Sequence, residues 1–410
     1  MLPRLRVNLD FFPSPVEDKP GLVIRDPFHY SDATLIVPTA LVACLEFFDG
    51  QQSELDLRAF LVQITGDVQS GALAEHLIDT LSKAGFLEDE KFAQRKAEAE
   101  RRFAESSVRE ATQAGSGYPS EAAELSETMR GYMNGAADTL ANSGSATSGS
   151  RVLAIAAPHV SPFGGIEAYR AAYSALSPSD AERTFVILGT SHYGEPDRIG
   201  LTRKPFRTPF GDTTTDLAIV DALAREAGEG AAMEDYCQAI EHSIEFQVVF
   251  LQHLFGAGIR VVPILCGSYA NSLYRGGMPE DSETVRRIFG ALGELAGREG
   301  DRLLWVLGID MAHMGRRYGD DMAAAADRDE MTVVARRDRS RIERMEAGDA
   351  RGFWEQVQVN RDDLKWCGSA PVYSFLKAVP GARGELLRYQ QWNIDEHSVV
   401  SFAGMRFHSS

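Results

Sequence analysis

Apolar positions follow different periods in different parts of this chain, and the change of period predicts two folded units. In the first hundred residues, GLVIRDP predicts a short strand, and the runs at 37–50, 55–64 and 72–85 have the i, i+3, i+4 spacing of amphipathic helices. Beyond residue 150, β-branched runs alternate with helical stretches. The strand-like runs are VLAIAAPH, TFVILGTSH, RVVPILCG and LLWVLGIDMAH, which predict an α/β domain around a largely buried sheet.

The segment between the two units has few large apolar side chains. Residues 106–150 are rich in Gly, Ser, Ala and Thr and end in NSGSATSGS, which predicts a helical and flexible linker. We therefore expect an N-terminal module over 1–105, the linker over 106–150 and the main domain over 151–410.

In the N-terminal module, Gly85 is suited to close the last of the three helices, and FLEDEKF then follows like the wing of a winged helix. A charged, solvated helix is expected from about residue 88 to 105. This pattern resembles the small PqqD-like winged-helix modules, and the resemblance implies a peptide or protein ligand for residues 1–105.

Composition narrows the class of protein. With 42 basic and 59 acidic residues the formal net charge is −17, which argues against nucleic-acid binding. We find neither an apolar run long enough to cross a membrane nor a secretory signal at the start, so we expect no membrane contact and a cytoplasmic location. The four cysteines include no CxxC pair, which fits a reducing compartment. Nucleotide-binding templates such as GxGxxG and the P-loop are missing, so no nucleotide cofactor is expected.

Three histidines directly follow predicted strands: His159 in APHVSPFGG, His192 in LGTSHYGEP and His313 in GIDMAHMG. Ligands bind at the carboxyl ends of strands in open α/β sheets, so this placement brings distant residues to one rim. Neutral imidazoles bind transition metals, usually with a carboxylate or thiolate as a further ligand. A hydrogen-bonded structural histidine is the alternative for each of the three.

Further ligands and acid–base groups come from three other motifs. Cys367, in WCGSAPV, precedes a predicted helix whose dipole favours a thiolate, although an inert buried cysteine fits as well. In EHSIEF, Glu241, His242 and Glu245 have metal-site spacing, and they also fit an ordinary capped helix, a shell that orients the ligands, or part of a substrate pocket. Asp310 lies three residues before His313, where a carboxylate could hold the imidazole as a general base.

These motifs resemble the Memo family in their order and spacing. APHVSPFGG, LGTSHYG, EHSIEFQVVFLQ, PILCGS, GIDMAHMG, WCGSAPV and SVVSFAGMRF together cover nearly all of 151–410. With the N-terminal module in front, the chain is similar to the long bacterial branch of the family, the AmmeMemoRadiSam system protein B. That branch implies radical SAM and AMMECR-type proteins as partners.

The resemblance implies a fold related to the LigB-like extradiol dioxygenases, an α/β sandwich around a central sheet. It implies metal ligands at His159, His192 and Cys367, a general base at His313 and Asp310 beside it. The dioxygenases have a carboxylate where this chain has Cys367, which puts ring cleavage in doubt. A set of two imidazoles and a thiolate suits copper or zinc, and iron(II) also fits. We expect an iron- or copper-dependent oxidoreductase. The alternatives are a non-catalytic accessory protein that binds a peptide or partner, and a zinc hydrolase.

Overall fold

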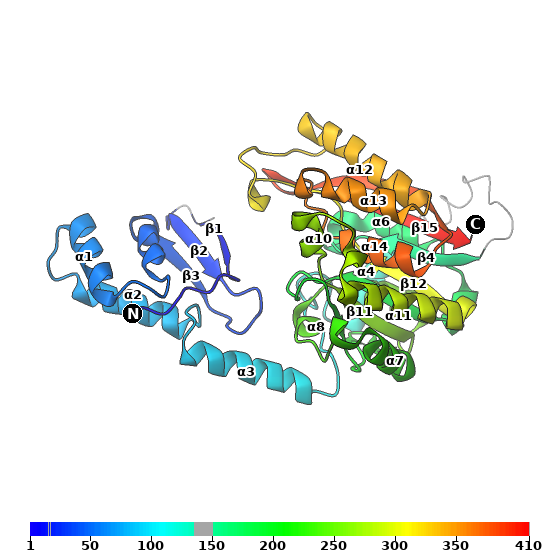
Figure 1. Ribbon diagram of the computed structural model, residues 1–410, viewed down its shortest axis with the longest axis horizontal. Coiled ribbons are helices and arrows are strands. Elements are labelled where there is room, and N and C mark those ends of the chain that lie inside the picture. Colours follow the sequence, from blue (N-terminus) through cyan, green and yellow to red (C-terminus); the bar gives the residue numbers. More distant parts are fainter. Residues whose placement is uncertain (15, 17, 135–150, 410) are drawn as a thin grey trace. The chain divides into compact units, whose positions relative to one another are not determined.

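The computed structural model describes residues 1–14, 16, 18–134 and 151–409 (Figure 1). The described chain divides into two compact units, Met1–Glu105 and Ser106–Ser410. Each unit has its own buried core. None of the described helices is both long and apolar enough to cross a bilayer.

The N-terminal unit combines a small antiparallel sheet with helices. The sheet has the order β1-β2-β3, formed by Asp10–Pro13, Gly21–Arg25 and Thr34–Pro38. The helical elements are the 3₁₀ helix η1 (Thr39–Phe47), α1 (Glu54–Thr65), α2 (Gly71–Lys83) and α3 (Glu90–Glu105). Gly85 follows α2 with φ +71°, so it closes that helix as predicted.

Two features of this unit differ from expectation. The run at 37–50 was expected to be one helix, but Pro38 ends a strand and the following turn is a 3₁₀ helix. The expected wing at 86–92 is not a hairpin. Leu87 makes an isolated bridge with Leu5, and Asp89 then accepts the amide of Phe92 at the start of α3. A winged-helix fold is therefore not confirmed.

The C-terminal unit is built on a ten-stranded mixed sheet. Its main order is β10-β6-β11-β5-β12-β4-β15-β13, formed by Ala231–Met233, Ile199–Leu201, Arg260–Cys266, Thr184–Thr190, Leu303–Gly308, Val152–Ala157, Ser398–Ser409 and His313–Gly315. β14 (Ala382–Asp395) pairs with β15, and β9 (Thr214–Thr215) pairs with β11. A separate pair joins β7 (Arg207–Thr208) and β8 (Gly211–Asp212). The four strands predicted in the main domain are β4, β5, β11 and β12, and they lie side by side and parallel.

Helices cover both faces of this sheet, as expected for an α/β sandwich (Figure 1). One layer contains α4 (Ala122–Met133), α6 (Pro162–Tyr173) and α9 (Glu245–Phe255). The other contains α7 (Leu217–Ala227), α11 (Glu283–Glu299), α12 (Glu330–Glu346), α13 (Ala350–Gln358) and α14 (Ser369–Ala378). The unit also contains the short helices α8 (Cys237–Ile240) and α10 (Ala270–Arg275) and several 3₁₀ turns. Along β5, Val186 and Leu188 face one layer while Phe185 and Ile187 face the other, because successive side chains of a strand alternate.

Part of the segment expected to be a linker is folded into the C-terminal unit. Residues 106–134 include α4, whose Leu125 and Met129 are buried in the core beside α6 and α9. Arg109 is also buried and pairs with Glu245 of α9. The low apolar content of residues 106–134 predicted a linker, but a few buried side chains are enough to fix this segment to the C-terminal unit. The remaining linker residues, 135–150, lie outside the described residues.

Candidate metal centre

Three neighbouring parallel strands bring the predicted site residues to one edge of the sheet. In the register, Gly308 of β12 pairs with Ala157 of β4 and with Gly189 of β5, so the three strands end side by side. His159 and Asp310 follow two residues after their aligned positions, and His192 follows three after. The carboxyl ends of parallel strands thus create the site, as the sequence predicts.

His159 is buried, and both of its ring nitrogens have defined surroundings. Its Nδ1 is 2.9 Å from the carbonyl oxygen of Gly308, and its Nε2 is 3.3 Å from Sγ of Cys367. Because a carbonyl can only accept, Nδ1 carries the proton and donates it. Nε2 points toward the sulfur, and once a metal ion displaced its proton it would have the lone pair that a metal ligand needs.

Glu241 holds two further histidines. Its buried carboxylate accepts the backbone amides of His192 and His242, both at 2.9 Å, and that of Ser243 at 3.2 Å. The Nδ1 atoms of the two rings lie 3.1 and 3.2 Å from its oxygens. A carboxylate that binds Nδ1 leaves Nε2 free, so Glu241 orients both imidazole rings.

Cys367 lies just before α14, in the loop that the sequence predicts. Thr190 at the end of β5 donates to the Cys367 carbonyl at 3.3 Å, which ties this loop to the strand that carries His192. Burial raises the pKa of the thiol, but the positive charges of His159 and His313 outweigh burial and lower the pKa to about 5. The sulfur is therefore a thiolate at neutral pH.

The charged groups around the site also shift the pKa values of its histidines and of Glu241. Burial favours the neutral form of His159, yet Asp310 and the Cys367 thiolate raise its pKa to about 9. In the same way, Glu241 and the thiolate overcome burial and raise the pKa of His192 well above its usual value. Burial lowers the pKa of His242 to about 4, so that ring stays neutral. The pKa of Glu241 lies far below its usual value because the histidine charges and amide donors outweigh its burial.

Asp310 and His313 do not form the pair expected from their spacing. One oxygen of Asp310 accepts the backbone amide of His159 at 2.9 Å, and the other lies 3.4 Å from His159 Nε2. Nδ1 of His313 instead faces the carbonyl oxygens of Met311 and Lys365, at 2.9 and 3.1 Å. The segment between them belongs to no helix, so residues three apart need not share a face. Backbone carbonyls, not Asp310, fix the tautomer of His313.

Glu245 is not brought to this site. Its buried carboxylate pairs with Arg109 and accepts hydrogen bonds from Tyr118, Thr112 and the Gln113 amide. The spacing of EHSIEF therefore does not build a His242–Glu245 ligand pair. Glu245 anchors residues 109–118 to α9.

His242 is closer to the centre than the sequence indicates. The rings of His159, His192 and His242 have centroids 5.0 to 5.3 Å apart. Two overlapping groups have candidate ligand atoms within 4.8 Å of one another, and both contain His159: one with His192 and His242, the other with Asp310 and Cys367. The donor set of imidazole nitrogens, thiolate and carboxylate fits a transition-metal ion.

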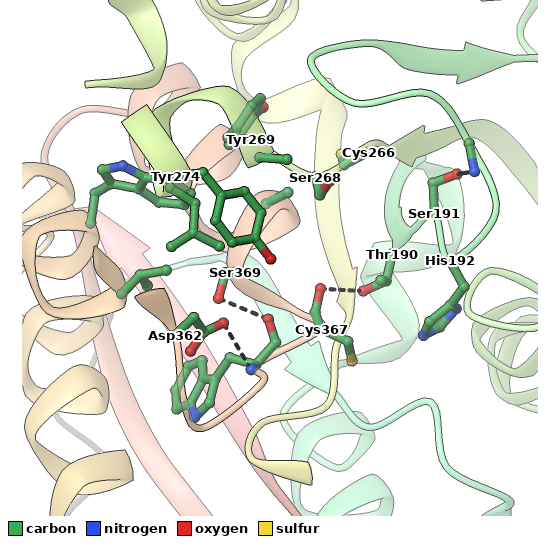
Figure 2. A pocket seen from close by; sticks show the side chains of 17 residues that line it. Thr190, Ser191, His192, Cys266, Ser268, Tyr269, Tyr274, Asp362, Cys367 and Ser369 are labelled. Carbon is green, nitrogen blue, oxygen red and sulfur yellow. Dashed lines mark hydrogen bonds between the residues drawn. The ribbon is translucent and has the colours of Figure 1, made fainter. Parts of the chain in front are cut away.

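A pocket of about 290 Å³ adjoins the centre. Figure 2 shows Thr190, His192 and Cys367 on one side of it and Tyr269 and Tyr274 on the other. A compound bound there would reach both Cys367 and His192.

The chain is similar to several known proteins of one family. Residues 109–406 match the family model described as "Memo-like protein". A MEMO1 family protein of Aquifex aeolicus is 25% identical over 415 residues, with all of both chains covered. One from Methanopyrus kandleri is 28% identical over 57% of this chain and 76% of its own length. One from Thermococcus kodakarensis is 29% identical over 63% of this chain and 87% of its own length.

Proposed function

We propose that this chain, which belongs to the Memo-like family, is an iron- or copper-dependent oxidoreductase with His159, His192 and Cys367 as the metal ligands. The observation that carries this proposal is the geometry of His159. Its Nδ1 is committed to the Gly308 carbonyl, while its Nε2 faces the Cys367 sulfur at 3.3 Å. A buried imidazole and a thiolate turned toward one another are what a shared metal ion requires.

The donor chemistry supports a redox metal. A thiolate is a soft, electron-rich ligand, and two imidazoles beside it suit copper or iron(II) as well as zinc. A bound iron or copper ion would supply one-electron redox chemistry and a coordination position for a further ligand. Zinc would instead favour hydrolysis, and the metal content distinguishes the two.

The protein's own groups would position the ligands and move protons. Asp310 holds the backbone at His159, and Glu241 holds both the backbone and the ring of His192. His313 has Nδ1 bound to carbonyls, so its Nε2 is the ring nitrogen that would exchange a proton with a substrate.

Metal analysis of the full chain tests this proposal. Protein purified without oxygen should contain, or take up, about one iron or copper per chain, measured by plasma mass spectrometry. Cys367→Ser should lose the ion, whereas Cys266→Ser, which changes a buried cysteine of β11, should retain it. If Cys367→Ser kept its full metal content, Cys367 would not be a metal ligand and the proposed ligand set would be wrong.

We also propose that the N-terminal unit docks a peptide or a partner protein, with radical SAM and AMMECR-type proteins as the candidates. Support comes from the division of the chain, since Met1–Glu105 has its own core and contains none of the metal-centre residues. The full chain used as bait should recover such a partner from cells that produce it. An empty pulldown against both candidate partners would count against this role.

A further inference from the structure

His242 lies between α8 and α9, and hydrogen bonds fix the backbone on both sides of it. Its amide donates to the Glu241 carboxylate at 2.9 Å, and its carbonyl accepts the Phe246 amide at 3.2 Å at the start of α9. The next residue, Ser243, donates its hydroxyl to the Thr190 carbonyl at 2.8 Å. The backbone at His242 is therefore held against the end of β5, the strand that leads into the site.

The rings of His242 and His192 are supported in the same way. Nδ1 of His242 lies 3.2 Å from one carboxylate oxygen of Glu241, and Nδ1 of His192 lies 3.1 Å from the same oxygen. The two ring planes are nearly parallel, at 6°, with centroids 5.2 Å apart. A carboxylate at Nδ1 is the support that orients a metal-ligating histidine and leaves its Nε2 for the ion. His242 has this support as His192 does.

His159 faces both of these rings from the end of the neighbouring strand. Its ring centroid is 5.0 Å from that of His192 and 5.3 Å from that of His242, and its plane is nearly perpendicular to both. One nitrogen of each ring lies within 4.8 Å of the other two, so small ring rotations would bring all three to one ion. Since Nδ1 of His159 donates to the Gly308 carbonyl, each of the three rings has its Nδ1 beside an oxygen acceptor and its Nε2 to offer.

His242 and His192 lie on the accessible side of the centre. Their side chains are 31% and 26% exposed, whereas those of His159 and Asp310 are 2% and 3% exposed. The other group of candidate ligands joins His159 to Asp310 and Cys367. An ion bound at His159 therefore adjoins an accessible pair of imidazoles on one side and the thiolate on the other.

We propose that His242 is a further ligand of the ion, so that the centre offers three imidazole nitrogens beside the Cys367 thiolate. This inference rests on the proposed function, because it places the third imidazole on the same ion. The added nitrogen makes the donor set less soft and moves its preference from copper(I) toward iron(II) and zinc. Such a set leaves open positions on a six-coordinate iron ion and fills a tetrahedral one.

Competition between the full chain and a chromophoric chelator for zinc measures the contribution of His242. His242→Phe keeps a ring beside His192 but has no donor atom. Loss of a group that only orients a ligand costs about ten- to a hundredfold in metal affinity, so loss of the ligand itself should cost about a hundredfold or more. His253→Phe, farther along α9, is the matched control and should bind zinc as the unmodified chain does. Unchanged zinc affinity in His242→Phe would overturn the proposal.

Added imidazole distinguishes a ligand from a residue that only packs. His242→Gly leaves a space that solvent can reach, where free imidazole can supply the missing nitrogen. Saturating imidazole should therefore tighten zinc binding of this variant by about tenfold or more, after correction for its effect on the unmodified chain. His242→Phe fills the same space and should show no such rescue. If imidazole does not rescue His242→Gly, His242 acts through packing and the proposal is wrong.

The same titrations separate this inference from the proposed function. If the unmodified chain binds no metal, both fail together. If it binds an ion that Cys367→Ser loses, while His242→Phe and His242→Gly retain it at full affinity, the proposed function stands and only the role of His242 is refuted.

Discussion

Replacing Glu241 by Gln should weaken metal binding by about ten- to a hundredfold. The carboxylate of Glu241 accepts three backbone amides and lies next to Nδ1 of both His192 and His242. Glutamine keeps one acceptor oxygen but places an amide donor where another donor already points. The loss of one charge-assisted hydrogen bond costs about 1.5–3 kcal/mol, which corresponds to roughly that range in affinity.

The matched control lies four residues along the chain. Glu245 is equally buried, but its carboxylate faces Arg109 and Tyr118 rather than the histidines. Glu245→Gln leaves the Arg109 guanidinium without its partner, so the C-terminal unit should lose about 3–5 kcal/mol of unfolding free energy in urea. Its metal affinity should change little, because none of the ligands touches it.

Competition with a chromophoric chelator for zinc or copper(I), under exclusion of oxygen, measures both affinities on folded protein. Glu241→Gln should release the ion to the chelator at a lower chelator concentration than the unmodified chain or Glu245→Gln. If Glu241→Gln binds as tightly as the unmodified chain, Glu241 does not support a metal ligand. If the two variants weaken binding equally, the effect comes from general destabilisation and the assignment fails.

Three further outcomes follow from local contacts. Burial raises the pKa of Cys367, but the charge of the neighbouring imidazolium groups lowers it to about 5. In metal-free protein the alkylation rate of Cys367 should therefore be constant from about pH 6 to 9 and fall only at lower pH, and a tenfold rise per pH unit would contradict this. Cys266, whose pKa burial raises to about 12, should stay unreactive. Gly308→Ala would place its Cβ too close to the Ser243 carbonyl oxygen. Urea unfolding should therefore show that the free energy of unfolding falls by about 1–3 kcal/mol. An unchanged free energy of unfolding would mean that the backbone relaxes to relieve this contact. Asp338→Asn should lower the melting temperature, because this buried carboxylate accepts three side-chain hydrogen bonds; an unchanged melting temperature would show that the amide replaces them.

The parts of the fold that the sequence predicts best are those with a strong local pattern. The four buried strands β4, β5, β11 and β12 are largely continuous apolar runs, and they end at Ala157, Thr190, Cys266 and Gly308. The expected linker was partly wrong for the opposite reason. Residues 106–134 have a weak local pattern, and their order depends on contacts such as Arg109 with Glu245, which are 136 positions apart.

At the candidate metal centre, too, only the local features could be predicted from the sequence. The strand-end positions of His159 and His192 follow from the pattern of apolar residues, because parallel strands bring their ends together. The hydrogen-bond partners of these side chains could not be predicted in this way. Glu241 reaches His192 across 49 positions and Asp310 reaches His159 across 151, whereas spacing alone pairs Asp310 with the nearby His313. Sequence spacing identifies which groups are available, and the tertiary structure decides which of them meet.

X-ray absorption of the metal-loaded full chain tests the proposed ligand set, because it identifies the donor atoms of the ion. We predict one sulfur neighbour and at least two imidazole nitrogens, with the sulfur at about 2.3 Å and the nitrogens at about 2.0–2.1 Å if the ion is zinc. Cys367→Ser should remove the sulfur signal. A shell of oxygen and nitrogen alone in the unmodified chain would contradict the ligand set of His159, His192 and Cys367.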